Sequence, residues 1–281
     1  MPDFGVFMFA TDYAIPPAEL AMAAEERGFE SIFFPEHTHI PSSRRTPWPG
    51  GSDLPKEYWH THDPFIALTA AAAVTERIKL ATGICLIPEH DPIALAKTLA
   101  SLDMLSNGRV ILGIGAGWNV EELEHHGSAF KDRWKVTRER ILAMRELWTK
   151  EEAEFHGEFV DFESSWSYPK PVQPGGPPVL LGATSKWAYD RVVDYCDGWM
   201  PIIGRADMRE AMERMRAAAD RGGRSMDTIQ LTAFGAPNDE KGARELLDLG
   251  FQRLVFGLPP APADVVLPLL DQYAGLAKTL A

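Results

Sequence analysis

Short apolar runs alternate with longer amphipathic or alanine-rich segments along most of the chain. Apolar runs bounded by turn residues predict buried strands, and the longer segments with helical periodicity predict helices. The expected strands are residues 4–9, 31–34, 78–86, 109–115, 178–182, 198–203, 228–234 and 253–257. The expected helices are residues 17–27, 64–75, 92–105, 133–148, 186–196, 207–221, 240–249 and 264–277. The pattern therefore predicts eight strand–helix pairs.

Strands that alternate with helices imply βαβ units and a parallel sheet. Eight pairs in 281 residues favour a (β/α)8 TIM barrel, with residues 1–281 in a single domain, and an open doubly wound sheet is the alternative. Two insertions interrupt the pattern. Residues 41–61 follow the second strand, and residues 151–177, with a possible short hairpin, precede the fifth. Long insertions in a compact domain tend to be functional.

The segment Arg109–Asn119 is an apolar run that ends in Gly113, Gly115 and Gly117, and a helix-compatible stretch follows it. A strand, a glycine-rich turn and a helix together favour an anion or cofactor cradle, because glycines let backbone N–H groups approach a ligand closely. The turn Gly182–Ser185 after the fifth strand has the same character, and we expect its small residues to begin a helix. The sequence thus offers two candidate phosphate sites.

In a barrel of this kind the chemistry lies at the carboxyl ends of the strands. Glu36, His37 and His39 follow the second strand, so His37 is a candidate site residue, although an isolated histidine is more often structural. Gly83 lies inside the third strand, where glycine suggests a bulge or a close approach. Trp118 is placed to contact a flat ligand or to pack under a loop.

Other aromatic and imidazole groups are candidates with two interpretations each. Trp48, Tyr58 and Trp59 in the first insertion form either an aromatic lid or part of a dimer interface. His125 and His126 are expected in an exposed loop or helix, with a functional role as the alternative.

Composition narrows the choice of function. The formal net charge is −12, which argues against a non-specific nucleic-acid binder, because such a protein needs a basic face. We expect no membrane span, since no long apolar run occurs, and no signal peptide at the first residues. Cys85 and Cys196 are expected to be buried free thiols in a reducing cytoplasm, with a disulfide as the alternative.

A metal-dependent hydrolase is the competing interpretation of the histidines. His37, His39, His60 and His62 supply imidazole groups early in the chain. Hydrolases of this fold draw further His and Asp ligands from later strand ends. Because the fifth to eighth expected strands end without early His or Asp, we predict no metal site.

The chain resembles the luciferase-like monooxygenase superfamily, and most of all the deazaflavin (coenzyme F420) dependent oxidoreductases typical of actinobacteria. The resemblance runs from about residue 4 to residue 203 and is weak over the last eighty residues. The segments that carry it are Asp63-Pro-Phe, Ile78–Ile84, Asp91–Asp103, Leu105–Asn119, Pro169–Gln173 and Gly198–Pro201.

The resemblance implies a role for each candidate position. Thr82, Gly83 and Ile84 match a bulge where a cis peptide, here Gly83–Ile84, backs the central ring of the cofactor. Glu36 and His37 match an acidic-residue–histidine pair at the reactive edge of the ring. The turns that hold ribityl hydroxyls and phosphate match Gly115, Gly117, Trp118 and Asn119 in the first segment, and Gly182, Ala183, Thr184 and Ser185 in the second.

The residue at position 118 departs from the pattern of one group within the family and argues against the substrates of that group. In the sugar-phosphate dehydrogenases of this family an acid stands at the position of Trp118, and lysines bind the substrate phosphate. Since Trp118 is no acid and the later strand ends carry no such lysines, we do not expect oxidation of a sugar phosphate.

The resemblance therefore predicts an F420-dependent oxidoreductase that moves a hydride between C5 of the cofactor and a small-molecule substrate. His37 is then the proton donor or acceptor, and Glu36 is expected to orient it or to tune its pKa. The alternatives are an FMN-dependent two-component monooxygenase with a separate flavin reductase, and a non-catalytic flavin-binding protein. Family members are often homodimers, and the apolar helices after the second and third strands are candidates for such a face.

Overall fold

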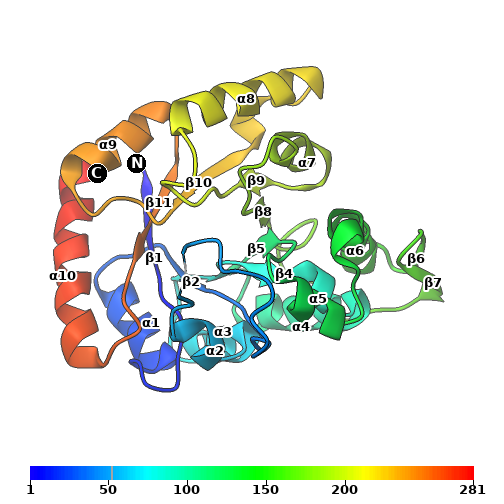
Figure 1. Cartoon of the computed structure of the whole chain (residues 1–281), viewed down its shortest axis with the longest axis horizontal. Helices are drawn as coiled ribbons and strands as arrows, with labels where there is room; N and C mark the ends of the chain where they lie inside the picture. Colours follow the sequence, from blue (N-terminus) through cyan, green and yellow to red (C-terminus); the bar gives the residue numbers. More distant parts are fainter. Residues whose placement is uncertain (52) are drawn as a thin grey trace.

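The computed structural model describes residues 1–51 and 53–281 and contains a closed barrel of parallel strands (Figure 1). β1 pairs with both β2 and β11, and β3 pairs with β5, so the sheet has no open edge. The strands are β1 (Asp3–Phe7), β2 (Ser31–Phe34), β3 (Lys79–Thr82), β4 (Cys85–Leu86), β5 (Val110–Gly115), β8 (Val179–Leu181), β9 (Gly198–Trp199), β10 (Gln230–Phe234) and β11 (Arg253–Gly257). β3 and β4 together form the third barrel strand, so the predicted eight-stranded barrel is confirmed.

Eight long helices surround the strands, and the two chain ends lie on the same side of the molecule, beside α9 and α10 (Figure 1). They are α1 (Pro17–Glu26), α3 (Pro64–Ala72), α4 (Pro92–Leu105), α6 (Arg133–Thr149), α7 (Ala188–Tyr195), α8 (Met208–Arg221), α9 (Glu240–Leu249) and α10 (Ala263–Leu280). Four of them begin at an aspartate whose side chain accepts a backbone N–H of the first turn: Asp63, Asp91, Asp207 and Asp239. Such caps satisfy N–H groups that have no partner within the helix.

Shorter elements occupy the loops between the strands and helices. The insertion 41–61, in which Ser52 lies outside the described residues, carries α2 (Glu57–His60). α5 (Val120–His125) follows the glycine turn after β5, and a 3-10 turn covers Ile87–Glu89. The second insertion contains the predicted hairpin, β6 (Ala153–His156) and β7 (Asp161–Ser165), which projects beyond α6 (Figure 1). Further 3-10 turns cover Phe130–Asp132 and Met226–Thr228.

The third barrel strand is interrupted where the mid-strand glycine indicated a bulge. Ala81 pairs with Ile111 of β5, whereas Cys85 pairs with Ile114. Four steps along this strand therefore match three along β5, so one residue is extra. The peptide bond between Gly83 and Ile84, which lies in this interruption, is cis, as the resemblance implied.

Several predicted elements are shorter in the structure, and two of these differences lie at the strand ends that face the site. The strand expected over 198–203 ends at Trp199, because Pro201 has no N–H for the ladder and pairing resumes only as a bridge at Ile202. The helix expected from Lys186 begins at Ala188, so the turn Gly182–Ser185 does not itself open the helix. This corrects the expectation that the small residues of Gly182–Ser185 begin the helix.

Large apolar side chains fill the barrel, and a buried arginine closes the end opposite the site. The interior cluster consists of Phe33, Ala81, Ile111, Leu180, Met200, Phe234 and Val255. At the amino end of β5 the guanidinium of Arg109 donates to the carbonyl oxygens of Ala72, Thr75, Ile78 and Ser106 and to the Thr75 hydroxyl. One cation thus joins the end of α3, the start of β3 and the end of α4.

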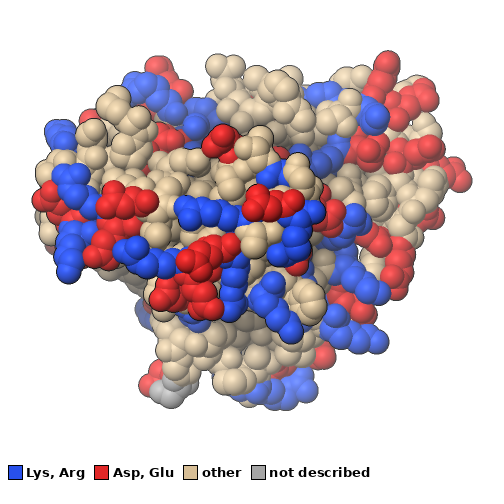
Figure 2. Space-filling view, turned by 90° about the horizontal axis from the view of Figure 1, so that it is seen from above, with Lys and Arg blue, Asp and Glu red and all other residues tan. Residues whose placement is uncertain are grey.

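Cys85 and Cys196 are buried free thiols, as predicted. On the face in Figure 2, acidic and basic side chains are interspersed. Surface ion pairs include Arg27–Asp271 at 2.8 Å. Among the described residues no helix combines the length and the apolar character needed to cross a bilayer.

Arg109→Lys should lower the free energy of unfolding by about 2–4 kcal/mol, because an ammonium group cannot reach the carbonyls that the guanidinium serves. Urea denaturation measures the change. Arg214→Lys is the matched control, since Arg214 is exposed and pairs with Glu210 one turn away. If Arg109→Lys and Arg214→Lys lowered the free energy of unfolding equally, the structural role given to Arg109 would be contradicted.

Candidate active site

A cavity of about 620 Å³ lies at the carboxyl ends of the barrel strands, a volume suited to a cofactor or a small ligand. Its walls come from the segments that follow most of the barrel strands and from the first insertion. The lining residues are Phe7, Phe9, Pro35, Glu36, His37, Trp48, Pro49, Tyr58, Gly83, Ile84, Leu86, Gly115, Ala116, Gly117, Trp118, Trp134, Gly182, Ala183, Thr184, Ile202, Arg205, Phe234 and Gly235.

Most of the predicted site residues meet in this cavity: Glu36, His37, Gly83, Ile84, Gly115, Gly117, Trp118, Gly182, Ala183 and Thr184. Three predicted residues do not line it. Thr82 is buried and donates its hydroxyl to Gly113 O at 2.7 Å, and Asn119 caps α5 by accepting from Glu122 N. Ser185 is exposed beyond the end of β8. Thr82 and Asn119 therefore shape the site from behind its wall.

The side chain of Ile84 explains two glycines that the sequence alone assigned to a phosphate cradle. A Cβ at Gly115 would stand 2.1 Å from Ile84 Cδ1, and one at Gly182 would stand 2.8 Å from Ile84 Cγ2. Glycine at both positions thus leaves room for the Ile84 side chain in the conformation that it adopts here. Gly117 differs, because its φ of +78° is a left-handed turn conformation that favours glycine.

His37 lines the cavity and is held from behind by a carboxylate that sequence reasoning missed. Its Nδ1 lies 2.9 Å from both carboxylate oxygens of Glu122, on α5. Both side chains are almost fully buried, with exposed fractions of 6% and 1%. A carboxylate at Nδ1 fixes the orientation of the ring and leaves Nε2 as the nitrogen for a ligand.

Glu36 does not orient His37, so that prediction is corrected. Glu36 accepts from His90 Nε2 at 2.7 Å and from Leu86 N at 2.6 Å. Burial alone would raise the pKa of Glu36, but these hydrogen bonds hold it below the usual value, and they raise the pKa of His90. Glu36 therefore fastens the loop after β2 to the third strand.

Glu36, Cys85 and His90 also lie close enough together to be considered as metal ligands. Burial, and next the charge of Glu36, raise the pKa of the Cys85 thiol well above its usual value, so that the thiol keeps its proton. A protonated thiol is a poor ligand, and the carboxylate is engaged by His90 and Leu86. We assign the group as a hydrogen-bonded cluster.

The first turn of α5 also anchors the first insertion. Glu121 accepts from Thr46 N at 3.0 Å and from the Thr46 and Ser43 hydroxyls. Although burial opposes the charge, the hydrogen bonds from Thr46 lower the pKa of Glu121 to about 2. Two consecutive glutamates thus have different partners: Glu121 holds the insertion over the site, and Glu122 holds His37.

Aromatic rings surround His37 on the cavity side. The Tyr58 ring lies 5.1 Å from the imidazole and the Trp118 ring 5.9 Å, while Trp48 and Phe9 pack against Tyr58. Trp59 is half exposed and does not line the cavity, so only Trp48 and Tyr58 belong to the predicted aromatic lid. Among the described lining residues Arg205 is the one cation.

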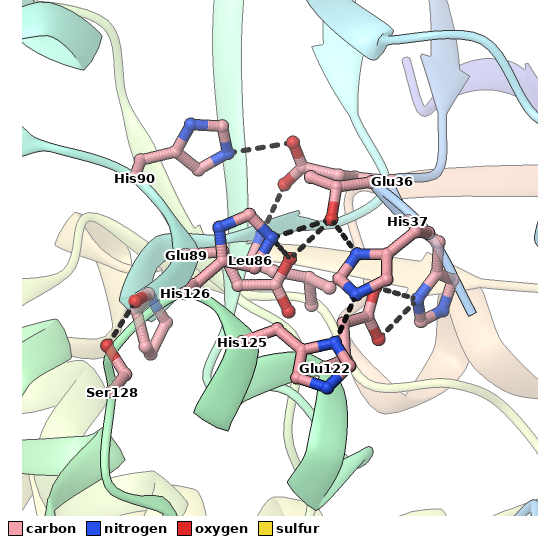
Figure 3. A network of polar contacts seen from close by, with 12 residues as sticks. Glu36, His37, Leu86, Glu89, His90, Glu122, His125, His126 and Ser128 are labelled. Atoms are coloured by element: carbon pink, nitrogen blue, oxygen red, sulfur yellow. Dashed lines mark hydrogen bonds and ion pairs between the residues drawn. The ribbon is translucent and has the colours of Figure 1, made fainter. Parts of the chain in front are cut away.

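A second polar group lies behind His37, as Figure 3 shows. Thr38 Oγ1 is 2.7 Å from His126 Nε2 and 3.4 Å from the buried carboxyl of Glu89. Burial, and then the charges of Glu122 and Glu36, raise the pKa of Glu89 to about 9. A buried carboxyl with this pKa is protonated at neutral pH.

A family model described as luciferase-like monooxygenase matches residues 15–256, a stretch that includes His37, Glu122 and every barrel strand except β1 and the last residue of β11. The chain belongs to the luciferase-like monooxygenase family.

This luciferase-like chain is 41% identical to an uncharacterized protein of Mycobacterium tuberculosis, over 96% of the chain and 97% of that protein. It is 28% identical to the F420-dependent glucose-6-phosphate dehydrogenase of Nakamurella multipartita, over 90% of the chain and 72% of that enzyme. In structure it is similar to the monooxygenase RslO1 of Streptomyces bottropensis, with a TM-score of 0.80 and 19% identity. That match covers 99% of the chain and all of RslO1. The similarity to RslO1 shows which fold the chain has.

The residues that the sequence missed share one property: their partners are distant along the chain. Glu122, Glu89 and His90 act on residues 36–38, which lie at least 50 positions away. The one available signal for Glu122 was the pair Glu121-Glu122 soon after the glycine turn. Acidic residues in the first turn of a helix commonly interact with the helix N-terminus, so the pair did not by itself indicate a contact with His37.

The raised pKa of Glu89 predicts a specific pH dependence of stability. The usual value is 4.5 and the folded value about 9, so between these limits the folded chain holds a proton that the unfolded chain has released. The free energy of unfolding therefore falls as the pH rises through this window. Glu89→Gln removes the titration and should become more stable than the wild type by on the order of 3 kcal/mol at about pH 8.

Thermal or urea unfolding at several pH values measures this difference. Glu163→Gln serves as the control, since Glu163 is an exposed glutamate on β7. A Glu89→Gln variant that is less stable than the wild type at about pH 8 would show that Glu89 is ionised in the fold.

Proposed function

We propose that the chain is an F420-dependent oxidoreductase that transfers a hydride between C5 of the deazaflavin and an uncharged small organic substrate. The carrying observation is the cavity-lining His37, held by the buried Glu122, in the same cavity as Gly83–Ile84 and the two glycine turns. The F420-dependent dehydrogenase among the relatives supports the choice of cofactor.

The lining residues fit a tricyclic ring with a polar tail. The interrupted strand at Gly83–Ile84 offers a backbone surface for the ring, and the turns at Gly115–Gly117 and Gly182–Thr184 offer backbone groups for the ribityl chain and phosphate. When bound, the deazaflavin supplies the two-electron hydride chemistry. The protein then has to orient the substrate carbon toward C5 of the deazaflavin and to donate or accept one proton at the substrate oxygen.

His37 is the group that donates or accepts this proton. Glu122 engages Nδ1, so Nε2 gives a proton to the substrate oxygen in reduction or takes one from it in oxidation. Tyr58 and Trp118 pack near the ring and limit the water that reaches it. The substrate side of the cavity is largely aromatic, which suits an apolar alcohol or carbonyl compound and not a sugar phosphate.

Cofactor titration of the purified protein tests the proposal. F420 should bind with at least about tenfold higher affinity than FMN, followed by the fluorescence of either cofactor. Tight binding of FMN alone would favour the two-component monooxygenase with a flavin reductase, the alternative that the family description itself suggests.

His37→Gln should lower turnover by about 100-fold or more and leave cofactor affinity within about twofold, because the lost group acts on the proton. Glu122→Gln should lower turnover less, since the ring keeps its place but loses the partner of its charged form. Glu124→Gln is the matched control, because Glu124 is exposed on the same helix. Unchanged turnover in His37→Gln would remove the role assigned to this residue.

We also propose that the chain forms a homodimer through α3 and α4. Both helices expose large apolar side chains, among them Ile66 at 71% and Leu105 at 76%. Exposed apolar patches commonly mark association surfaces. Sedimentation analysis should give a dimer for the wild type and a monomer for Ile66→Glu combined with Leu105→Glu.

A further inference from the structure

Two arginines on neighbouring helices lie on the same side of the molecule as the cavity. Arg133 is the first residue of α6, and Arg191 lies in the first turn of α7. The two helices are neighbours on the outside of the barrel (Figure 1). In a barrel of this kind each helix runs back against its strand, so the first helical residues lie near the carboxyl ends of the strands. Both arginines therefore stand on the face at which the cavity opens.

Trp134 connects this arginine pair to the cavity. Its indole lines the cavity, and the guanidinium carbon of Arg191 lies 4.1 Å from the centre of the indole ring. Arg133 directly precedes Trp134 and stacks on the Phe130 ring at 3.7 Å. Stacking occupies the face of a guanidinium, so N–H groups at its edge stay available for other partners. One indole ring thus contacts both the cavity and the Arg191 guanidinium.

Neither guanidinium of the pair is neutralised by an acid of the chain. Arg133 and Arg191 are half-buried, and among residues 1–51 and 53–281 no ion pair involves either of them. The two acids of α7, Asp190 and Asp194, are instead paired with other arginines, each at 2.6 Å. The pair therefore carries two positive charges without an ion-paired carboxylate.

The two positive charges are close enough to act on one another. Burial lowers the pKa of both guanidinium groups, and the charge of Arg191 lowers that of Arg133 further. Arg133 Nε and Arg191 Nη1 are also buried without a hydrogen-bond partner in the described part of the chain. Like charges that are held together in a poorly solvated place are costly unless an anion joins them. The arrangement favours the binding of an anion with several oxygen atoms.

We propose that Arg133 and Arg191 bind the carboxylates of the oligoglutamate tail of F420. The inference rests on the proposed function, because it assigns a site to one part of the cofactor. In F420 the phosphate is followed by a lactyl group and a chain of γ-linked glutamates. The turn Gly182–Ser185, which is a candidate for the phosphate, leads directly into α7, and Thr184 lines the same cavity as Trp134. A tail that leaves this turn away from the ring passes the first turns of α6 and α7.

This assignment gives the chain a means to distinguish two cofactors. The phosphate of either F420 or FMN can accept from backbone N–H groups at the glycine turns. FMN ends at its phosphate, so carboxylates beyond that point exist in F420 alone. A guanidinium binds a carboxylate through two parallel N–H groups, which adds both energy and geometric selectivity. Arg133 and Arg191 are therefore specificity-determining residues that act on the tail and not on the reacting carbon.

A series of cofactors with different tails tests the site in the wild-type protein. Fluorescence titration compares the deazaflavin riboside, F420 without glutamate, and F420 with about two and about five glutamates. The Kd should fall at least about tenfold from the form without glutamate to the longest tail, because each carboxylate adds a charged contact. About 0.5 M KCl should remove this gain, since salt screens exposed charges.

Equal affinity for every tail length would overturn the proposal. A gain that comes with the phosphate alone, and not with the glutamates, would also overturn it, because the arginine pair would then serve the phosphate.

Arg191→Gln, alone and combined with Arg133→Gln, tests the two residues directly. Both variants should lose most of the gain from the tail and keep the affinity for F420 without glutamate within about twofold, because only the tail contacts are removed. That retained affinity also shows that the variants are folded. Arg138→Gln is the matched control, since Arg138 lies on α6 and pairs with Asp194. An equal loss for all tail lengths, or an intact gain, would contradict the assignment.

A probe without the deazaflavin separates this proposal from the proposed function. Failure of every deazaflavin to bind would contradict the proposed function. In that case γ-linked tetraglutamate is titrated into protein with labelled arginine Nε and followed by NMR. The Arg133 and Arg191 signals should shift, and about 0.5 M KCl should reverse the shift. If neither signal shifts at up to about 20 mM peptide, the anion site itself is overturned.

Discussion

The extra residue between Thr82 and Cys85 is the constraint on which the cavity depends. It shifts the pairing of the third barrel strand with β5 by one position and turns Ile84 toward the turns after β5 and β8. Glycine at residues 115 and 182 leaves room for the Ile84 side chain, because a Cβ at either position would meet it closely. The same shift places Leu86 N against Glu36, which fixes the loop that carries His37. A single register change thus positions both the cavity wall at Gly83–Ile84 and the loop that carries His37.

The second organising feature is the first turn of α5, which follows the glycine turn directly. Two consecutive glutamates there point to different partners, one to the first insertion and one to His37. The charge of Glu122 is held in a poorly solvated space, which is costly unless it is paired and hydrogen-bonded. The hydrogen bond with His37 offsets the cost of burying the Glu122 charge. Because Glu89 is protonated, it adds no second negative charge near Glu122. Catalytic geometry and stability are therefore linked through the same carboxyl groups.

The fold was predictable from the sequence because hydrophobic periodicity reports on each strand and helix locally. The apolar run 109–115, the Asp-Pro helix starts at residues 63 and 91, and the mid-strand Gly83 each indicated the element found there. Strand and helix ends were less predictable, as at Pro201 and Ala188. The resemblance located the cavity wall, including Glu36, His37 and Trp118. The partner of His37 was missed, since a contact between residues 37 and 122 leaves no local pattern in the sequence.

The central claim is that the chain transfers a hydride and does not activate oxygen. Its most direct test uses F420 reduced with deuterium at C5, mixed with the protein and a panel of apolar carbonyl compounds, under nitrogen and under air. The account predicts deuterium on the product carbon, at the same rate in both atmospheres. Oxidation of the cofactor that requires air and leaves no deuterium in any product would contradict it.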